Sequence, residues 1–461
     1  MKRISLRAGI LFAAAALFIF GLAVFVLFYV SNATDWAMYT GNTHLYTNGV
    51  FTGGGEITDR HGVVLAQTKK DKRVFNSNSD IRLSTLHVVG DANGFISTGA
   101  HTAFRKQLSG YNFITGLFSV NGGHNDLQLT IDADVCAAAY RALGSYYGTV
   151  GLYDYKTGKT ICMVSTPSYD VNSKADTERA KNGDYEGVFM NRFISSSYAP
   201  GSTFKIITAA AAIDTFGDVY TRTYRCEGGC KIGGETVKCT GWHNDISLKQ
   251  AFAVSCNSYF SQLAVDLGKE KMTEYAEKFG FNKKFSIDGI EAKRSSYNVE
   301  KARKIQLGWS GIGQYNDMQN PLQYLTVIGG IANGGTPVKP YLIDSVRNSS
   351  GIVTKRGSAK KASRVCSDST AKKLQELMDG AVAITYGKSF FTGLDVCGKT
   401  GTAEVDGRTP HAEFVGFCTD EKYPFAFVVV VEEGGSGNYI AKWVANQVLQ
   451  VAKKSYDKSL G

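Results

Sequence analysis

The feature that most restricts this chain is an uncharged apolar run near its N-terminus, at residues 8–30. About 20 helical residues are enough to cross a bilayer, so the run is long enough to span a membrane. Lys2, Arg3 and Arg7 precede it. Positive charge before an apolar helix favours a cytoplasmic tail, so everything after residue 30 is expected outside the cytoplasm. We predict a single-pass protein of the cell membrane, with residues 1–7 as the cytoplasmic tail and residues 8–30 as the anchor.

A cleaved signal peptide is the alternative reading of this run. Signal peptides have an apolar region of about 7–15 residues followed by a cleavage site with small side chains. The run at 8–30 is longer, and no clear small-x-small site follows it. These differences favour an uncleaved anchor.

The rest of the chain is too long for one hydrophobic core, because the whole has 461 residues. Residues 31–125 are predicted to form a small pedestal domain, in which 54–66 has the pattern of a strand, a tight turn at 59–62 and a second strand. Residues 126–461 are predicted to form the larger domain. The net charge of +10 would suit a polyanion, but no zinc-finger spacing, Walker loop or Arg-rich block points to nucleic acid.

From residue 126 onward, strand and helix patterns alternate. Two strands come early, around a hairpin turn at Lys156-Thr157-Gly158, and three come near the C-terminus. This arrangement predicts an α/β (α+β) domain with one antiparallel five-stranded sheet flanked by helices. The predicted strands are 149–155, 159–165, 398–405, 411–417 and 425–431, and the predicted helices include 131–143, 203–213 and 440–453.

Three short motifs carry the chemistry: Ser-Thr-Phe-Lys at 202–205, Ser-Cys-Asn at 255–257 and Lys-Thr-Gly-Thr at 399–402. None is specific alone, and context has to select among copies. Similar patterns occur at Ser358, Ser369 and Ser455 for the first motif, at Ser119, Ser296 and Ser436 for the second, and at Lys156 for the third.

Context favours Ser202, because Pro200-Gly201 stops the chain just before an almost wholly apolar helix. Its hydroxyl is expected at the helix N-terminus, and Lys205 lies one turn further on the same face. A serine hydroxyl needs a base, and a lysine can serve if desolvation or another cation lowers its pKa. The other serine copies lie in polar stretches and are interpreted as helix caps and solvated termini.

The two remaining motifs are expected to face the same cleft. Residues 399–402 open a strand whose edge could offer N–H groups to a peptide and to an oxyanion. Residues 255–257 fall between helical stretches at 248–254 and 259–267, where a hydroxyl and an amide could be aimed inward. A plain helix cap remains the alternative for this motif.

In this order the motifs resemble those of class B penicillin-binding proteins, in the superfamily that also contains serine β-lactamases. Cys256 stands where the lactamase form has Asp, which is more similar to the transpeptidases than to class A β-lactamases. The resemblance is strong over 126–453 and weak over 54–66. Further stretches that fit are Asp-Arg-His-Gly at 59–62, Tyr-Ala-Pro-Gly at 198–201, Gly-Ile-Gly-Gln at 311–314, Asn-Pro-Leu-Gln at 320–323, Ala-Asn-Gly-Gly at 332–335 and residues 411–416.

The resemblance implies a peptidoglycan D,D-transpeptidase. Ser202 would attack the penultimate D-Ala carbonyl of a stem peptide and form an acyl-enzyme, with Lys205 as the base. Ser255 would relay a proton to the leaving D-Ala, and Asn257 would bind the substrate amide. Lys399 would keep the site electropositive, and the substrate-binding strand would hold the terminal carboxylate through Thr400 and Thr402, on either side of Gly401. The N–H groups of Ser202 and Thr402 would form the oxyanion hole.

The resemblance also implies the partners. A second stem peptide would resolve the acyl-enzyme and make the cross-link, and β-lactam antibiotics would acylate and inhibit the enzyme. No metal or organic cofactor would be required. The region before residue 126 is too short for a glycosyltransferase domain as well as a pedestal. A separate membrane glycan polymerase, contacted through the anchor and pedestal, is therefore expected.

Nine cysteines in an exported chain are an odd number, so at least one should lack an intramolecular partner. Cys226, Cys230 and Cys239, with His243 nearby, could form a zinc cluster. The outer location and the irregular spacing instead favour a local disulfide, Cys226–Cys239, if the compartment is oxidising. No cysteine is assigned a catalytic role.

Other functions remain possible on sequence alone. A D,D-carboxypeptidase differs only in passing the acyl group to water. A serine β-lactamase needs a base that activates water for deacylation, and no second motif clearly supplies one. A β-lactam sensor would need an output module, for which a seven-residue tail leaves no room, and a non-enzymatic scaffold for wall assembly would not need intact motifs.

Overall fold

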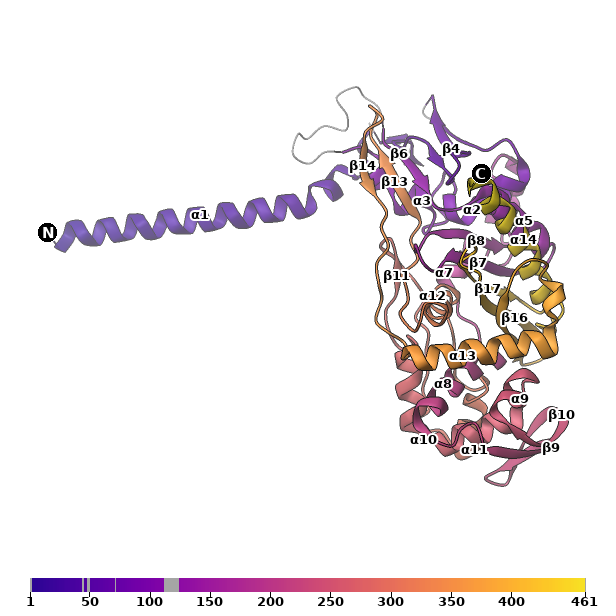
Figure 1. The fold of residues 1–461 in the computed structure, drawn as a ribbon. Coiled ribbons are helices and arrows are strands. Elements are labelled where there is room, and N and C mark those ends of the chain that lie inside the picture. The colour runs from indigo at the N-terminus through magenta and orange to yellow at the C-terminus, as the bar shows by residue number, and fades with distance from the viewer. Residues whose placement is uncertain (1, 44, 48–49, 71, 112–123, 461) are drawn as a thin grey trace.

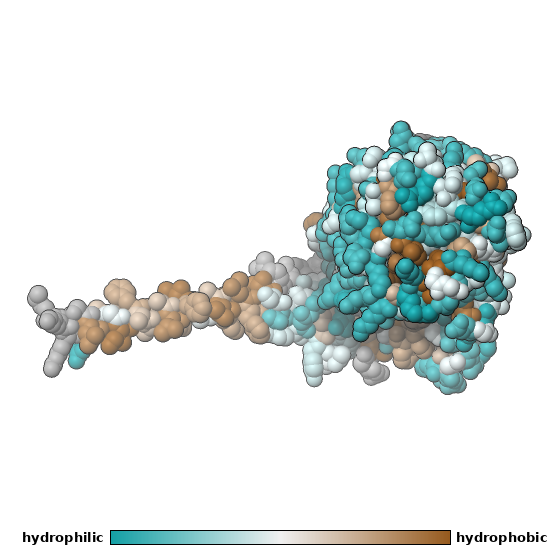
Figure 2. All heavy atoms as spheres, turned by 90° about the horizontal axis from the view of Figure 1, so that it is seen from below, coloured by the Kyte–Doolittle hydropathy of each residue, from teal (hydrophilic) through white to brown (hydrophobic). Residues whose placement is uncertain are grey.

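The N-terminal anchor is one long helix in the computed structural model, which describes residues 2–43, 45–47, 50–70, 72–111 and 124–460. Helix α1 (Lys2–Ala37) extends away from the rest of the molecule (Figure 1). Its segment Leu6–Ala37 has a mean hydropathy of 2.9 in its most apolar part and buries none of it. The apolar surface of α1 contrasts with the largely hydrophilic body (Figure 2). A helix of this length and composition can cross a bilayer.

An antiparallel five-stranded sheet forms the centre of the body, as predicted. Its strand order is β15-β16-β17-β7-β8, so the two early strands join the three late ones at the β17–β7 contact. Strands β7, β8 and β17 are buried along their whole length, which explains their near-continuous apolar sequences. The bounds are β7 (Gly148–Asp154), β8 (Thr160–Thr166), β15 (Val396–Val405), β16 (Arg408–Cys418) and β17 (Phe425–Val431).

Helices cover both faces of this sheet. On one face α5 (Ala133–Leu143) and α14 (Ile440–Leu460) pack together, and Tyr456 of α14 makes an edge-on contact with Phe425. On the other face lies α12 (Pro321–Ala332), whose Gly329 lies against the Tyr153 ring. Successive residues of a strand point to opposite faces, so Tyr153 toward α12 and Asp154 toward α14 mark the two layers.

A second sheet, of six strands in the order β14-β13-β6-β3-β4-β5, lies at the end of the molecule where α1 joins the body (Figure 1). It combines the predicted hairpin of the pedestal with β6, which follows the pedestal directly, and with β13 and β14, which come about 200 residues later. Strand β6 pairs with β3 and with β13, so residues before and after position 125 share one hydrogen-bonded sheet. The bounds are β3 (Ile57–Thr58), β4 (Val64–Lys69), β5 (Lys72–Phe75), β6 (Asp126–Leu129), β13 (Ile343–Arg347) and β14 (Val353–Arg356).

The opposite end of the body is helical and carries a separate two-stranded hairpin, β9–β10 (Figure 1). It contains the segments that bear the first two motifs. Its elements are η1 (Gly201–Phe204), α8 (Lys205–Thr215), β9 (Thr223–Ile232), β10 (Glu235–Ser247), α9 (Leu248–Ala253), α10 (Asn257–Lys278) and α11 (Lys304–Ser310). The remaining elements are β1 (Tyr46–Thr47), β2 (Val50–Phe51), α2 (Ser79–Val89), α3 (Ala100–Ala103), α4 (Arg105–Leu108), α6 (Lys174–Lys181), α7 (Arg192–Ser195), β11 (Ser286–Ile287), β12 (Ile290–Glu291), α13 (Asp368–Ala381), η2 (Val382–Tyr386) and η3 (Lys388–Phe390).

Candidate active site

Ser202 lies in η1, a single turn of 3-10 helix, rather than in the first turn of an α-helix as predicted. The difference comes from Gly201, whose φ of +51° makes the chain enter the helix through a tighter turn. A side chain at 201 would also place its Cβ 2.6 Å from the carbonyl oxygen of Thr402. The turn therefore needs glycine, and it brings Ser202 next to strand β15.

Lys205 begins α8, and its side chain is fully buried. Its Nζ lies 3.0 Å from Ser202 Oγ, so the predicted pairing along one helix face is present. The same Nζ lies 2.6 Å from the carbonyl oxygen of Ser255, 3.0 Å from Ser255 Oγ and 2.7 Å from Asn257 Oδ1. One amine thus connects the first two motifs.

The Ser255–Asn257 segment is the short connection between α9 and α10. Ser255 has a φ of +58°, a conformation that is uncommon for residues other than glycine and that clusters at functional sites. The turn points Ser255 Oγ at both lysines of the site. Cys256 accepts a hydrogen bond from the N–H of Tyr259 as the N-cap of α10, and Asn257 Nδ2 donates to the carbonyl of Lys238 at 3.1 Å.

Lys399 lies on β15 and is also fully buried. Its Nζ donates to Ser255 Oγ at 3.0 Å, to the hydroxyl of Tyr386 at 3.2 Å and to the carbonyl of Thr400 at 3.1 Å. Ser255 Oγ therefore lies between two amines. Through Lys205, the hydroxyls of Ser202 and Ser255 and the amine of Lys399 form one connected cluster.

Burial shifts the pKa values of both amines downward. Burial, followed by the nearby charge of Lys399, holds the pKa of Lys205 well below its usual range. Burial alone lowers the pKa of Lys399 to about 7. The hydrogen-bond partners of both amines in the described part of the chain are hydroxyl, carbonyl and amide oxygens, so no hydrogen-bonded carboxylate raises either pKa.

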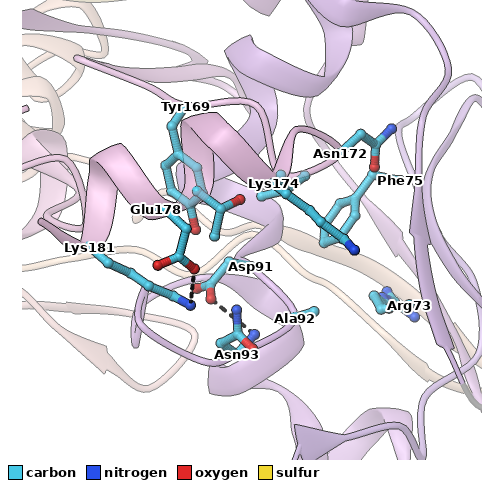
Figure 3. A pocket seen from close by; sticks show the side chains of 12 residues that line it. Arg73, Phe75, Asp91, Ala92, Asn93, Tyr169, Asn172, Lys174, Glu178 and Lys181 are labelled. Atoms are coloured by element: carbon cyan, nitrogen blue, oxygen red, sulfur yellow. Dashed lines mark hydrogen bonds and ion pairs between the residues drawn. The ribbon is translucent and has the colours of Figure 1, made fainter.

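Figure 3 shows a cavity of about 440 Å³ whose lining contains no residue of this cluster. Its walls come from the pedestal side, with Arg73 and Asp91, and from the segment after β8, with Tyr169 and Lys174. Within it Lys181 forms an ion pair with Glu178, and Asp91 accepts a hydrogen bond from the backbone of Asn93. None of the predicted site residues lines it, so this cavity is separate from the predicted site.

The family model of the penicillin binding protein transpeptidase domain matches residues 148–450. The chain belongs to this family. Its curated relatives include the peptidoglycan D,D-transpeptidase PbpA of Mycolicibacterium smegmatis, which is 32% identical over 74% of this chain and 76% of the relative. The stage V sporulation protein D of Bacillus subtilis is 30% identical over 67% of this chain and 49% of the relative.

Solved structures agree with this membership. The D,D-transpeptidase domain of a peptidoglycan glycosyltransferase from Eggerthella lenta has a TM-score of 0.76 at 29% identity and covers 87% of this chain and 98% of its own. The imipenem acyl-enzyme complex of penicillin-binding protein A from Mycobacterium tuberculosis has a TM-score of 0.77 at 27% identity, with 87% and 98% covered. The predicted family and its fold are both confirmed.

Within this transpeptidase fold, the residues predicted from the sequence gather at one place. Ser202, Lys205, Ser255, Asn257 and Lys399 are joined by direct contacts. The strand residues adjoin them. Thr400 Oγ1 donates to Tyr386 at 2.9 Å, and a Cβ at Gly401 would lie 3.0 Å from the carbonyl of Pro200, while Thr402 adjoins Gly201.

Sequence reasoning missed two residues of the site. Tyr386, at the end of η2, holds Lys399 and both the N–H and the side chain of Thr400 through one hydroxyl. Glu413 of β16 is buried beneath the site, where burial raises its pKa well above the usual range and its carboxyl accepts from Thr203 and Gln319. No local pattern marks Tyr386, and the matching stretch 411–416 gave Glu413 no role, because each residue meets the motifs only through the fold.

The duplicate motifs lie elsewhere. The Lys156 copy forms the β7–β8 turn, as predicted, and Ser455 contacts Asp132 and His61 on the other side of the sheet. The expected Cys226–Cys239 disulfide is absent. All nine cysteines fall in the described part of the chain, and each is a free thiol there.

Proposed function

We propose that this chain is a peptidoglycan D,D-transpeptidase that works through an acyl-enzyme on Ser202. The observation that carries the proposal is the position of Lys205 Nζ, which lies 3.0 Å from both Ser202 Oγ and Ser255 Oγ. One group can then take the proton of the nucleophile and pass it on to a second hydroxyl. The names of the relatives, which include D,D-transpeptidases, support the reaction class.

The hydrogen-bond partners of Lys205 suit a neutral base. A neutral amine has two N–H donors and one lone pair. The carbonyl oxygen of Ser255 and Oδ1 of Asn257 accept only, and they take the two donors. The lone pair is left for the hydroxyl proton of Ser202. Burial and the charge of Lys399 keep the pKa of Lys205 low enough for this state to be populated near neutral pH.

In acylation, Ser202 Oγ would bond to the carbonyl carbon of the penultimate D-Ala while its proton moves to Lys205. The C–N bond to the terminal D-Ala then breaks, and the departing amine takes a proton from Ser255, which Lys205 restores. In the second half, the amine of another stem peptide attacks the ester, an amide forms and Ser202 regains its proton. Lys399 lies 3.0 Å from Ser255 Oγ, so its positive charge would stabilise the negative charge that develops on this oxygen as it gives up its proton.

Strand β15 would hold the substrate. It is the edge strand of the five-stranded sheet, so its outer N–H and C=O groups can pair with an extended peptide. Thr400 and Thr402 would bind the terminal carboxylate on either side of Gly401. The N–H groups of Ser202 and Thr402 would form the oxyanion hole, supported by the close approach of Gly201 to Thr402.

The setting of the reaction is part of the proposal. Residues 1–7 would lie in the cytoplasm, 8–30 would anchor the chain, 31–125 would form the pedestal and 126–461 the transpeptidase domain outside the membrane. β-Lactams would acylate Ser202, in keeping with the acyl-enzyme complexes named for the Mycobacterium tuberculosis protein. A separate glycan polymerase of the membrane would supply the glycan chains that carry the stem peptides.

Intact mass spectrometry of the full chain with benzylpenicillin tests the proposal. The expected result is one stable adduct per chain, on the peptide that contains Ser202, and no adduct in Ser202→Ala. Ser358→Ala, which removes the exposed serine of another Ser-x-x-Lys copy, is the matched control and should label fully. A label on another residue, or rapid turnover of penicillin without an adduct, would contradict the assignment.

A further inference from the structure

Three cysteines and one histidine bring their donor atoms together beside the Ser255–Asn257 turn. Cys226 comes from β9, Cys239 and His243 from β10, and Cys256 from the N-cap of α10. All four donor atoms lie within 4.8 Å of one another. The sequence had suggested Cys230 as the third sulfur, but its Sγ points to the carbonyl of Ser258 instead.

The spacing of these atoms fits the corners of one coordination tetrahedron. Zinc binds sulfur at about 2.3 Å and imidazole nitrogen at about 2.0–2.1 Å, so tetrahedral edges measure roughly 3.8 Å between sulfurs and roughly 3.5 Å between sulfur and nitrogen. Cys239 Sγ lies 3.8 Å from Cys256 Sγ, and His243 Nδ1 lies 3.3 Å from Cys226 Sγ and 3.7 Å from Cys239 Sγ. A disulfide would need the sulfurs at about 2.05 Å.

The local fold aims these side chains inward. Strand β10 pairs with β9 through two register irregularities, between Lys238 and Trp242 and between Trp242 and Asn244. Bulges of this kind re-aim side chains. They leave Trp242 exposed while Cys239 and His243, on either side of it, turn toward the buried Cys226. Among the described residues no third strand pairs with this hairpin, and both of its strands pack against α10.

We propose that Cys226, Cys239, His243 and Cys256 bind one Zn²⁺ ion, which ties the β9–β10 hairpin to the Ser255–Asn257 turn. Three thiols and one imidazole are donors that Zn²⁺ prefers over oxygen-seeking cations. Binding would release the thiol protons and leave a complex of net charge −1. The proposal revises the expectation that the chain needs no metal, although the ion would take no part in bond making.

The ligands reach the catalytic cluster through Asn257. Its N–H donates to Cys239 Sγ at 3.3 Å, and its side-chain NH₂ donates to the carbonyl of Lys238, the residue before that ligand. Its Oδ1 in turn lies 2.7 Å from Lys205 Nζ. Groups around a metal site commonly orient one another in this way. The Zn²⁺ ion would therefore position Asn257 and Ser255, as a structural clamp on the proposed active site.

Metal analysis of the full chain in detergent, by elemental mass spectrometry, tests binding directly. The expected result is one zinc per chain, with most of it lost in Cys226→Ser, Cys239→Ser and His243→Ala. Cys230→Ser removes a thiol of the same hairpin outside the cluster and should keep one zinc. Zinc far below one per chain, or equal loss in Cys230→Ser, would overturn the proposal. So would a loss of two titratable thiols without zinc, because that outcome indicates a disulfide.

Cobalt substitution tests the ligand set on wild-type protein, so it does not depend on variants that fail to fold. Co²⁺ bound at this site should give the intense visible bands of a tetrahedral ion and thiolate charge-transfer absorption. A six-coordinate spectrum without thiolate bands would overturn the ligand assignment. Ser202→Ala should keep its zinc while losing penicillin labelling, so failure of this inference and failure of the proposed function give different results.

The clamp itself is tested by chelation. Removing zinc should lower the thermal midpoint and slow acylation by a fluorescent penicillin at least several-fold, and added Zn²⁺ should restore both. Cys230→Ser should respond as wild type does. Unchanged acylation after complete zinc removal would show that the ion does not position the Ser255–Asn257 turn.

Discussion

At the scale of single residues, the charge of Lys399 acts on the base. Lys205 must be neutral to accept a proton, so acylation should fall as pH drops through its lowered pKa. The Lys399 charge helps to lower that pKa, and its removal should therefore raise it. In Lys399→Gln we expect the acidic limb of the rate profile to move to higher pH, as measured with a fluorescent penicillin across pH 5–9.

The control for this shift is Lys156→Gln, which alters the Lys-Thr-Gly copy in the β7–β8 turn and should leave the profile unchanged. The wild-type rate should also decline on the alkaline side, because Lys399 loses its charge around its pKa of about 7. If the acidic limb does not move in Lys399→Gln, the charge of Lys399 does not set the pKa of Lys205, and the prediction is wrong.

Tyr386 is expected to position the third motif rather than to touch substrate. Its hydroxyl contacts Lys399 Nζ, the Thr400 N–H and Thr400 Oγ1. Tyr386→Phe removes all three contacts and keeps the ring, so we expect acylation to slow about tenfold, on the order of 1–2 kcal/mol for buried hydrogen bonds. The thermal midpoint should fall as well, because Lys399 Nζ and the Thr400 N–H lose a buried partner. A slower rate with an unaltered pH profile distinguishes this positioning role from a role in proton transfer.

These residues also mark what the sequence could predict. Ser202, Lys205 and Lys399 were predictable because short patterns, a Pro-Gly stop and an apolar helix restrict their local conformation. Tyr386 and Cys256 were not, since their contacts depend on segments that meet only after folding. The favoured Cys226–Cys239 disulfide was wrong, and the sequence alternative of a cluster with Cys230 named a thiol that contacts the carbonyl of Ser258 instead.

At the scale of elements, α12 packs so closely on the sheet that one of its residues must be glycine. A Cβ at Gly329 would overlap the Tyr153 hydroxyl. Overpacking of this kind costs about 1–3 kcal/mol, so Gly329→Ala should lower the free energy of unfolding by at least that much in urea titrations.

Gly380 supplies a matched control within the same molecule. It lies in helix α13 with no other atoms close to where a Cβ would be. Gly380→Ala should therefore stabilise the protein by about 0.5–1 kcal/mol, through the unfolded chain. If the two substitutions had similar effects, the packing of α12 on Tyr153 would not be a determinant of stability.

Four of the five strands of the central sheet were predictable to within about two residues, because buried strands leave clear periodic patterns. Strand β16 begins three residues earlier, and α14 ends seven residues later, than the patterns indicate. The shift of Ser202 into a 3-10 turn was not, since it depends on the contact between Gly201 and strand β15. The left-handed φ of Gly201 could not be predicted from the sequence, because the requirement for it comes from the strand that packs against this residue.

At the scale of the whole molecule, the single apolar helix predicts orientation. With Lys2, Arg3 and Arg7 on the cytoplasmic side, the body should lie outside. In spheroplasts of an expressing bacterium, added protease should digest everything beyond α1, while a tag on the N-terminus stays protected until the membrane is opened. A protected body with an accessible tag would reverse the assignment.

The six-stranded sheet shared by the pedestal and the catalytic body has a mechanical consequence. Strand β3 of the pedestal pairs with β6, β6 pairs with β13, and β13 pairs with β14, after which the chain returns to α13 about a dozen residues later. A hinge at position 125 would have to break the backbone bonds between β3 and β6, so the pedestal and the catalytic body should tilt as one rigid unit. A partner protein bound to α1 could then change the distance between Ser202 and the cell wall without changing the geometry of the active site.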